Sequence, residues 1–156
     1  MQKVVDGINY WIKRLPEEYN SMSEKEISNR PLPNKWSKKE ILGHLCDSAI
    51  NNIESFIKIQ YEEPLYVIQS YNQNHWVIVQ NYQDRSLDEI INLFQALNKQ
   101  VVNIVKNIPN EKLSNLCDIG NNQYQTLEWL IKDYLEHLEH HIHKQILIEN
   151  RLYGQN

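Results

Sequence analysis

The 156-residue sequence has few of the residues that build cross-linked or turn-rich folds: two Cys, four Gly and five Pro. The two cysteines, Cys46 and Cys117, are far apart and belong to no CxxC pattern. This spacing gives no basis for a disulfide framework or a cysteine-based zinc site. The scarcity of Gly and Pro predicts long regular elements joined by few tight turns.

Clusters of basic residues and long apolar runs are also missing from the sequence, and the net charge is −4. Without a basic patch there is no electrostatic footprint for nucleic-acid binding. The first 15 residues are amphipathic, but they include Asp6, Lys13 and Arg14 and do not resemble a signal peptide. No segment is long and apolar enough to span a bilayer. We therefore expect a cytoplasmic protein with reduced thiols, no nucleic-acid partner and no membrane partner.

The composition is that of an ordinary globular domain, with 41% hydrophobic and 23% charged residues. The length fits a single domain over residues 1–156. Apolar residues recur at steps of three and four in four stretches, which predicts four long helices and an all-α four-helix bundle. The stretches are about 4–15, 38–61, 87–108 and 126–150.

An additional short helix is expected within residues 71–82. Trp76 to Val79 has strand propensity, but an isolated strand in a helical chain has nothing to pair with. We found no convincing pair of strands elsewhere, and we interpret residues 23–36 and 110–125 as connectors.

Four positions predict where helices begin and end. Ser37 with Glu40, and Ser86 with Glu89, have the spacing of capping boxes, which start helices. Pro16 is expected to interrupt or end the first helix, although another turn can follow it, and Pro64 marks the end of the second.

Four of the six histidines lie in the last predicted helix, in the segment YLEHLEHHIHKQ. His137 and His141 are four residues apart and therefore project from the same helix face. The apolar spacing around them predicts that this face points inward. His44 is the only histidine expected on the core side of the second helix. These three imidazoles could converge inside a bundle as ligands of a divalent metal, leaving a position open for water or substrate.

The alternative is that these histidines are neutral, hydrogen-bonded core residues or solvated side chains. A same-face pair together with His44 favours the metal over that alternative. His140 and His143 lie around the helix from the pair and are expected to face solvent or to support the metal ligands from outside. His75 is expected at the border of the pocket or on the surface.

Two familiar metal motifs are absent from the sequence. None of the histidines is followed by the Glu that HExxH requires, and none has the Glu three residues earlier that marks di-iron bundles. Zincin-type proteolysis and ferritin-like di-iron chemistry therefore have no basis in this sequence.

Three segments together resemble the DinB/YfiT-like superfamily. The first is Lys35-Trp36-Ser37-x-x-Glu40-Ile-Leu-Gly-His44-Leu-x-Asp47. The second, which is weaker, is Tyr71-Asn-Gln-Asn74-x-Trp76 with Asn81-Tyr82. The third is Thr126-Leu-Glu-Trp129 followed by Glu136-His137-x-x-His140-His141-x-x-x-Gln145-Ile146.

This resemblance implies a four-helix bundle, often with an extra short helix and often a homodimer. It implies a divalent metal, usually zinc or nickel, on His44, His137 and His141. Family members with assigned activities include S-transferases that use a low-molecular-weight thiol, an isomerase of a thiol conjugate, and candidate metal-dependent hydrolases. Relatives often carry acidic residues where this chain has Asn72 and Asn74, which puts any base or outer ligand at those positions in doubt.

We therefore predict a metal-dependent enzyme that activates a thiol or water for transfer to, or hydrolysis of, a small-molecule substrate. Asp47, Tyr134 and Gln145 are candidates to orient an imidazole or bind substrate, and Asn74 and His75 are candidates at the pocket border. The alternative from another class is a non-catalytic helical module for binding or dimerisation in a stress response, with a vestigial metal site.

Overall fold

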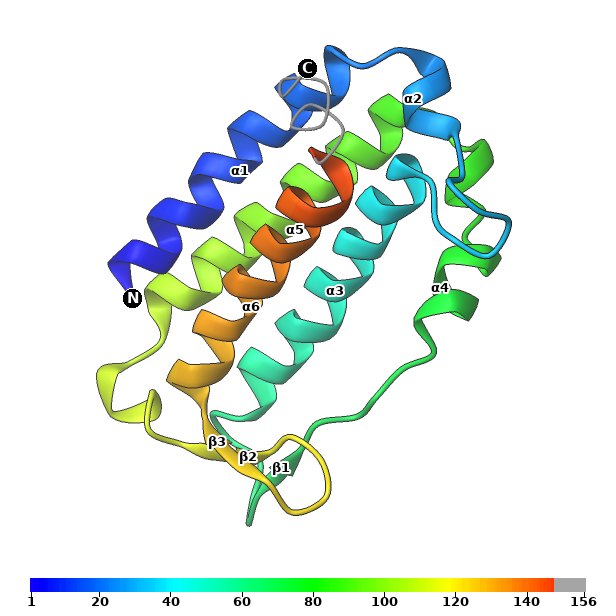
Figure 1. The fold of residues 1–156 in the computed structure, drawn as a ribbon. Coiled ribbons are helices and arrows are strands. Elements are labelled where there is room, and N and C mark those ends of the chain that lie inside the picture. The colour runs from blue at the N-terminus through cyan, green and yellow to red at the C-terminus, as the bar shows by residue number, and fades with distance from the viewer. Residues whose placement is uncertain (148–156) are drawn as a thin grey trace.

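The computed structural model describes residues 1–147 as a helical structure with a small sheet at one end (Figure 1). The helices are α1 (Gln2–Asn20), α2 (Glu24–Ser28), α3 (Lys38–Lys58), α4 (Gln73–Val79), α5 (Leu87–Asn107) and α6 (Leu127–His141). The strands are β1 (Tyr66–Val67), β2 (Leu116–Asp118) and β3 (Tyr124–Thr126). A π-helical turn, Ile142–Ile146, continues α6, and short 3₁₀ turns occupy Tyr82–Asp84 and Asn110–Lys112.

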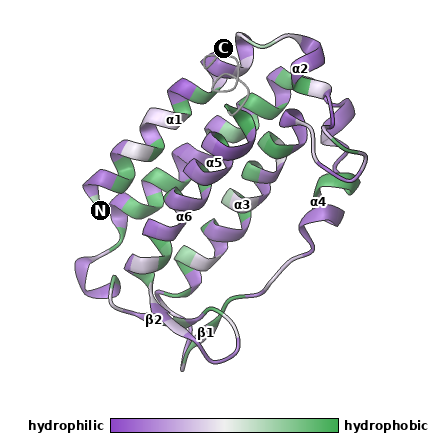
Figure 2. Cartoon of the chain, in the orientation of Figure 1, coloured by the Kyte–Doolittle hydropathy of each residue, from purple (hydrophilic) through white to green (hydrophobic). Residues whose placement is uncertain are grey.

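The four long helices α1, α3, α5 and α6 lie side by side, and this confirms the predicted bundle (Figure 1). Helix α5 packs against both α1 and α3, and α6 also contacts both of them. Apolar and polar positions alternate along each helix, so that each one can turn an apolar stripe to its neighbours (Figure 2). The short helix α4 confirms the one predicted within 71–82, and it packs against α3.

The core consists of two clusters of buried side chains along the bundle. The cluster at the sheet end includes Phe56, Val101, Cys117 and Ile131. The cluster at the opposite end, near α2 and α4, consists of Trp11, Leu15, Tyr19, Ile27, Ile41, Leu42, Leu45, Cys46, Val77, Tyr82, Ile90, Ile91, Phe94, Leu138, Ile142 and Ile146. Leu97 and Leu135 contact both clusters and join them.

The expectation that no strands pair was wrong. Strand β2 pairs in parallel with β1 and in antiparallel orientation with β3. In the second pair, Cys117 lies opposite Gln125. Each strand has only two or three residues, which is too short to show a period of two in the sequence. The pairing of β1 with β2 joins segments about 50 residues apart, so no hairpin signal announces it.

Pro16 does not end the first helix, because α1 continues through it to Asn20. Proline lacks an N–H and leaves the carbonyl four residues earlier without its helical donor. In this chain that carbonyl belongs to Ile12, and Nε2 of Gln95 on α5 donates to it at 3.0 Å. The neighbouring helix therefore supplies the hydrogen bond that the proline removes.

One of the two predicted capping boxes forms. The backbone N–H of Glu40 donates to Oγ of Ser37 at 3.1 Å, and the N–H of Ser37 donates to the Glu40 carboxylate at 3.0 Å. The prediction of a capping box at Ser86 was wrong, because the Ser86 side chain makes no capping hydrogen bond within the described chain. Glu89 instead accepts from the Arg85 guanidinium at 3.0 Å.

Two further boundaries differ from the prediction. The connector expected over 23–36 contains α2, which begins where the Ser23 side chain accepts from the N–H of Glu26. The last helix becomes a π-helical turn after His141, and its expected continuation to residue 150 lies outside the described residues. In the part of the chain that the structure describes, no helix is long and apolar enough to cross a membrane.

Candidate metal centre

His44 occupies the inner side of α3, one turn after the capping box that fixes the start of this helix. Its side chain is only 4% exposed. Its ring lies against the indole of Trp36, with 4.8 Å between ring centroids. Among the described residues, its buried Nδ1 has no hydrogen-bond partner. A buried imidazole nitrogen without a partner is costly unless a group outside the chain binds it.

His137 and His141 lie on the edge of the buried face of α6 rather than at its centre. The centre is formed by Leu130, Tyr134 and Leu138, and Ile142 extends it into the π-helical turn. The expectation that the histidine face points inward was therefore wrong for His137, whose side chain is 70% exposed. Each histidine stands one residue before a buried apolar position, and a step of one residue rotates a side chain by about 100° around a helix.

All three histidines nevertheless line one small pocket between α3 and α6, with a volume of about 40 Å³. The rings of His44 and His141 contact each other edge to face, with centroids 4.9 Å apart. The wall of the pocket is completed by Leu45, Ser48, Tyr71, Gln73, Tyr134 and Leu138. The structure thus brings the two halves of the predicted site together from segments that are far apart in the sequence.

The three rings do not converge on a single point in this conformation. Within residues 1–147, no group of three His, Cys, Asp or Glu side chains is arranged to hold a metal ion. Nε2 of His137 lies 3.9 Å from Oδ2 of Asp133, one turn earlier on the same helix. His137 thus lines the pocket with an exposed side chain whose ring lies near Asp133 in this structure.

The surroundings of His44 and His141 favour the neutral form of both imidazoles. Burial, together with the nearby His141 and His137, lowers the pKa of His44 to about 4. Burial also lowers the pKa of His141, and the neighbouring His137 and His140 act in the same direction against a hydrogen bond to Gln145. Neutral imidazole, with a free nitrogen lone pair, is the form that binds metals.

Gln145 forms a hydrogen bond with the ring of His141. Its Oε1 lies 2.7 Å from Nδ1 of His141. A hydrogen bond at one ring nitrogen fixes the tautomer and leaves the lone pair on the other nitrogen. Gln145, a candidate from the sequence to orient an imidazole or bind substrate, is thus a hydrogen-bond partner of His141.

Asp47 is fully buried, and its hydrogen bonds within the described residues go to Tyr82 and Gln80 rather than to a histidine. Its Oδ1 accepts from the hydroxyl of Tyr82 at 2.7 Å and from Nε2 of Gln80 at 2.8 Å. Its Oδ2 is buried without a partner among the described residues, and burial raises the pKa of this carboxyl group. The structure therefore gives Asp47 the role of fastening the segment after α4 to α3, in place of the imidazole-orienting role expected from the sequence.

The remaining candidates separate in space. Tyr134 lines the small pocket, but its hydroxyl donates to Oδ1 of Asn98 in the core at 2.5 Å. Asn74 lines a larger cavity nearby. His75 is exposed and lines neither of these two cavities. The Asn72 side chain caps α4 by accepting from the N–H of His75 at 3.0 Å.

Sequence reasoning missed Trp36, Tyr71 and Gln73 as residues around the histidines. All three lie in the motifs quoted for the family resemblance, which was the available signal. Their approach to His44 depends on how the connectors fold back, and no helical period describes that path.

The fold agrees with comparisons against known proteins. A family model described as the DinB superfamily matches residues 12–144. The chain belongs to the DinB superfamily. Its fold is also similar to that of YfiT from Bacillus subtilis, with a TM-score of 0.84 and 18% identity, over 97% of this chain and 86% of that one. This likeness establishes the four-helix bundle.

Two bacterial proteins are similar to this DinB-superfamily chain in sequence. One, from Oceanobacillus iheyensis, is 21% identical over 94% of this chain and 88% of its own length. The other, from Halalkalibacterium halodurans, is 22% identical over 86% of this chain and 82% of its own length. Both names give metal-dependent hydrolase as a candidate activity, as does the description of YfiT.

Proposed function

We propose that this DinB-superfamily chain is a metal-dependent enzyme whose divalent ion, zinc or nickel, is held by His44, His137 and His141. The observation that carries the proposal is the pocket between α3 and α6, which all three imidazoles line. The rings of His44 and His141 are in edge-to-face contact, and Nδ1 of His44 is buried without a partner among the described residues. The names of the similar proteins support the same class of activity.

The ligand set fits a catalytic ion better than a structural one, because three protein ligands leave a coordination position open. An ion held in this way supplies Lewis acidity, which makes a water or thiol nucleophilic at neutral pH. The chain itself contributes imidazoles at His44 and His141 whose pKa values are lowered by burial, a ring of His141 hydrogen-bonded to Gln145, and an exposed His137 at the pocket edge. Hydrolysis of a small molecule is the reaction that the similar proteins support, and transfer of a low-molecular-weight thiol is the reaction implied by the sequence motifs.

Metal analysis of the untagged protein tests the site. We expect about one equivalent of zinc or nickel per chain, as a mononuclear site requires. His137→Ala and His44→Ala should each lose it, whereas His75→Ala, at an exposed histidine outside both cavities, should retain it. Substoichiometric metal that does not increase on adding Zn²⁺ or Ni²⁺ would overturn the proposal. Equal metal content in His137→Ala and His75→Ala would overturn the assignment of the ligands.

The reaction is tested with the metal-loaded protein and a panel of ester, amide and electrophilic substrates, each with and without a small thiol. Turnover without thiol that is lost in His141→Ala supports hydrolysis. Turnover only when a thiol is present supports thiol transfer. If the metal is bound but neither reaction occurs and the protein binds a partner instead, the non-catalytic module becomes the better description.

The homodimer implied by the family resemblance also stays a proposal. Sedimentation equilibrium across a range of protein concentrations measures it, with twice the chain mass as the expected result.

A further inference from the structure

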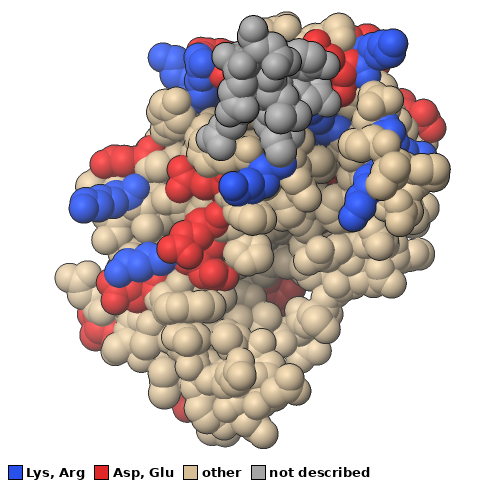
Figure 3. Space-filling model, in the orientation of Figure 1, with Lys and Arg blue, Asp and Glu red and all other residues tan. Residues whose placement is uncertain are grey.

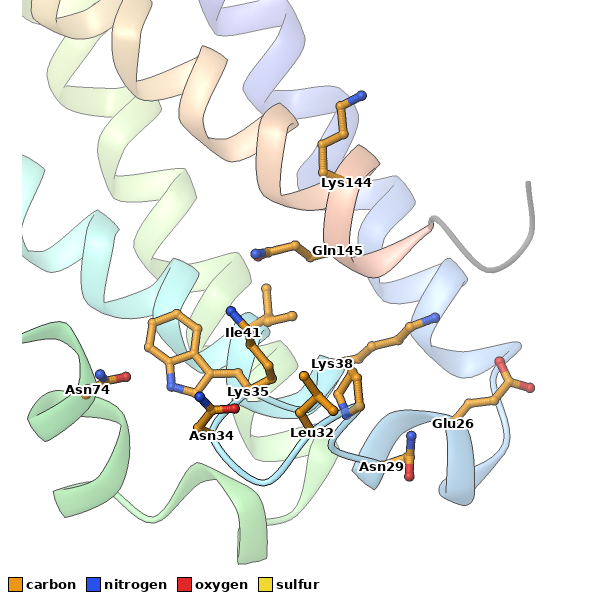
Figure 4. Close-up of a pocket in the computed structure, with 12 residues that line it drawn as sticks. Glu26, Asn29, Leu32, Asn34, Lys35, Lys38, Ile41, Asn74, Lys144 and Gln145 are labelled. Atoms are coloured by element: carbon orange, nitrogen blue, oxygen red, sulfur yellow. The ribbon is translucent and has the colours of Figure 1, made fainter. Parts of the chain in front are cut away.

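A second and larger cavity lies beside the histidine pocket. Its volume is about 620 Å³, which is within the range of about 300–1,000 Å³ that small-molecule sites occupy. Its walls come from α2, the connector before α3, the start of α3, α4 and the π-helical turn (Figure 4). Residues 26–41 are contiguous, whereas Asn74 and the π-helical turn are distant in the sequence, and the cavity exists only because the connectors fold over the end of the bundle.

Two residues that line the cavity contact histidines that line the small pocket. Trp36 lines the cavity, and its ring lies 4.8 Å from the ring of His44. Gln145 also lines the cavity, and its Oε1 lies 2.7 Å from Nδ1 of His141. A molecule in the cavity would therefore rest against the two residues that support the candidate metal ligands.

The lining of the large cavity combines apolar side chains with a net positive charge. Leu32, Trp36 and Ile41 give apolar surface, while the charged residues are three lysines and one glutamate. This local balance is opposite to the net charge of −4 of the whole chain. On the face of the molecule that Figure 3 shows, both blue Lys and Arg atoms and red Asp and Glu atoms lie at this end, so the positive balance belongs to the cavity lining itself.

Lys35 is the lysine placed to meet a ligand. In Figure 4 its side chain extends toward Ile41 and Gln145, whereas Lys144 extends away from the other labelled residues. Glu26, the acidic residue of the lining, lies at the start of α2, where Oγ of Ser23 donates to its carboxylate at 3.5 Å. The position of Lys35 predicts a pairing with a negatively charged group.

We propose that this cavity binds the substrate, and that the substrate is an elongated small molecule with an apolar body and one anionic group. The body would contact Trp36 and Leu32, the anionic group would pair with Lys35, and the opposite end would face the histidine pocket. The substrate role rests on the proposed function, whereas the binding itself does not. The anionic group is a carboxylate or a phosphate, because both pair with an ammonium group in the same way.

Isothermal titration calorimetry with 4-phenylbutyrate and its uncharged amide tests the proposal on the full chain as purified. We expect the acid to bind at least about tenfold more tightly than the amide, the difference that one charge-assisted hydrogen bond provides. Lys35→Gln should remove this preference and leave the amide unchanged. Lys106→Gln, at an exposed lysine on the last turn of α5, is the matched control and should retain it.

A titration with 2-phenylethyl phosphate distinguishes the two anionic groups, since the tighter ligand identifies which one the cavity prefers. Repeating the titrations in His137→Ala separates this proposal from the proposed function. Acid binding that persists without metal supports the cavity even if no metal-dependent activity is found. Equal binding of acid and amide, no saturable binding of either anion, or equal losses in Lys35→Gln and Lys106→Gln would overturn it.

Discussion

Asp47 shows how a single buried charge connects the site to the rest of the fold. Its Oδ1 accepts hydrogen bonds from Tyr82 and Gln80, and its Oδ2 is buried without a partner among the described residues. Tyr82 can approach so closely because residue 43 is glycine: a Cβ there would lie 2.2 Å from the Tyr82 ring. Gly43 therefore serves the Tyr82 contact, and alanine at this position would displace the ring.

Asp47→Asn is predicted to remove a pH dependence of stability. Burial raises the pKa of Asp47 above its ordinary value of 3.8, so the folded state holds this proton more tightly than the unfolded state. The contribution of Asp47 to the free energy of unfolding should therefore fall as the pH rises from 3.8 to the raised pKa, and stay level above it. Asparagine keeps the acceptor for Tyr82 without the charge, and the variant should lack this fall.

Urea unfolding at a series of pH values measures the difference, with Asp6→Asn as the control at an exposed carboxylate. An Asp47→Asn curve parallel to the wild-type curve across the whole acidic range would contradict the assignment of this pH dependence to Asp47.

At the scale of elements, the pairing of α1 with α5 depends on a compensation between two residues. Pro16 removes the helical donor for the Ile12 carbonyl, and Gln95 of α5 supplies another at 3.0 Å. The helix period of the first stretch was readable from the sequence, but a proline inside it predicts an interruption. Only the neighbouring helix makes the continuous α1 favourable.

A double-mutant cycle tests this compensation. Gln95→Ala should destabilise the protein by about 1–2 kcal/mol, because it leaves a half-buried carbonyl without a donor. In a Pro16→Ala background the new backbone N–H at position 16 satisfies Ile12, so Gln95→Ala should cost measurably less. Free energies from urea unfolding give the coupling, and additive effects of the two substitutions would show that Gln95 does not compensate for Pro16.

At the scale of the whole molecule, each of the two core clusters contains one buried cysteine, and the two cysteines lie in different kinds of element. Cys46 lies inside α3 in the cluster near the candidate site, and Cys117 lies in a three-residue strand in the cluster at the sheet end. Both thiols are buried, and burial raises the pKa of each. Neither is a reactive nucleophile in the folded protein, which agrees with their interpretation as small core residues.

Thiol labelling is predicted to detect a difference in opening between the two ends. Without denaturant, both cysteines should react with a thiol reagent far more slowly than in the unfolded chain. In low urea Cys117 should label before Cys46, because a short strand opens more readily than the middle of a long helix. The variants Cys46→Ser and Cys117→Ser assign each rate. Equal rates at every urea concentration would indicate one cooperative unit.

The sequence by itself determined the four long helices, because an apolar period of three to four residues is a local property and the Ser37 capping box marks a boundary locally. It also selected His44, His137 and His141, since the same-face pair follows from helix geometry and His44 was the one histidine on the core side of its helix. The family motifs selected the same three residues.

Only the tertiary structure decided what depends on contacts between distant segments. The pairing of β1 with β2, the continuation of α1 through Pro16, and the partners of Asp47 each require a group supplied from elsewhere in the chain. The outward position of His137 was decided there too, because helix spacing gives the relative directions of side chains, whereas packing against α3 decides which direction is buried. The large cavity beside Trp36 and Gln145 is likewise a product of connectors, whose paths carry no period in the sequence.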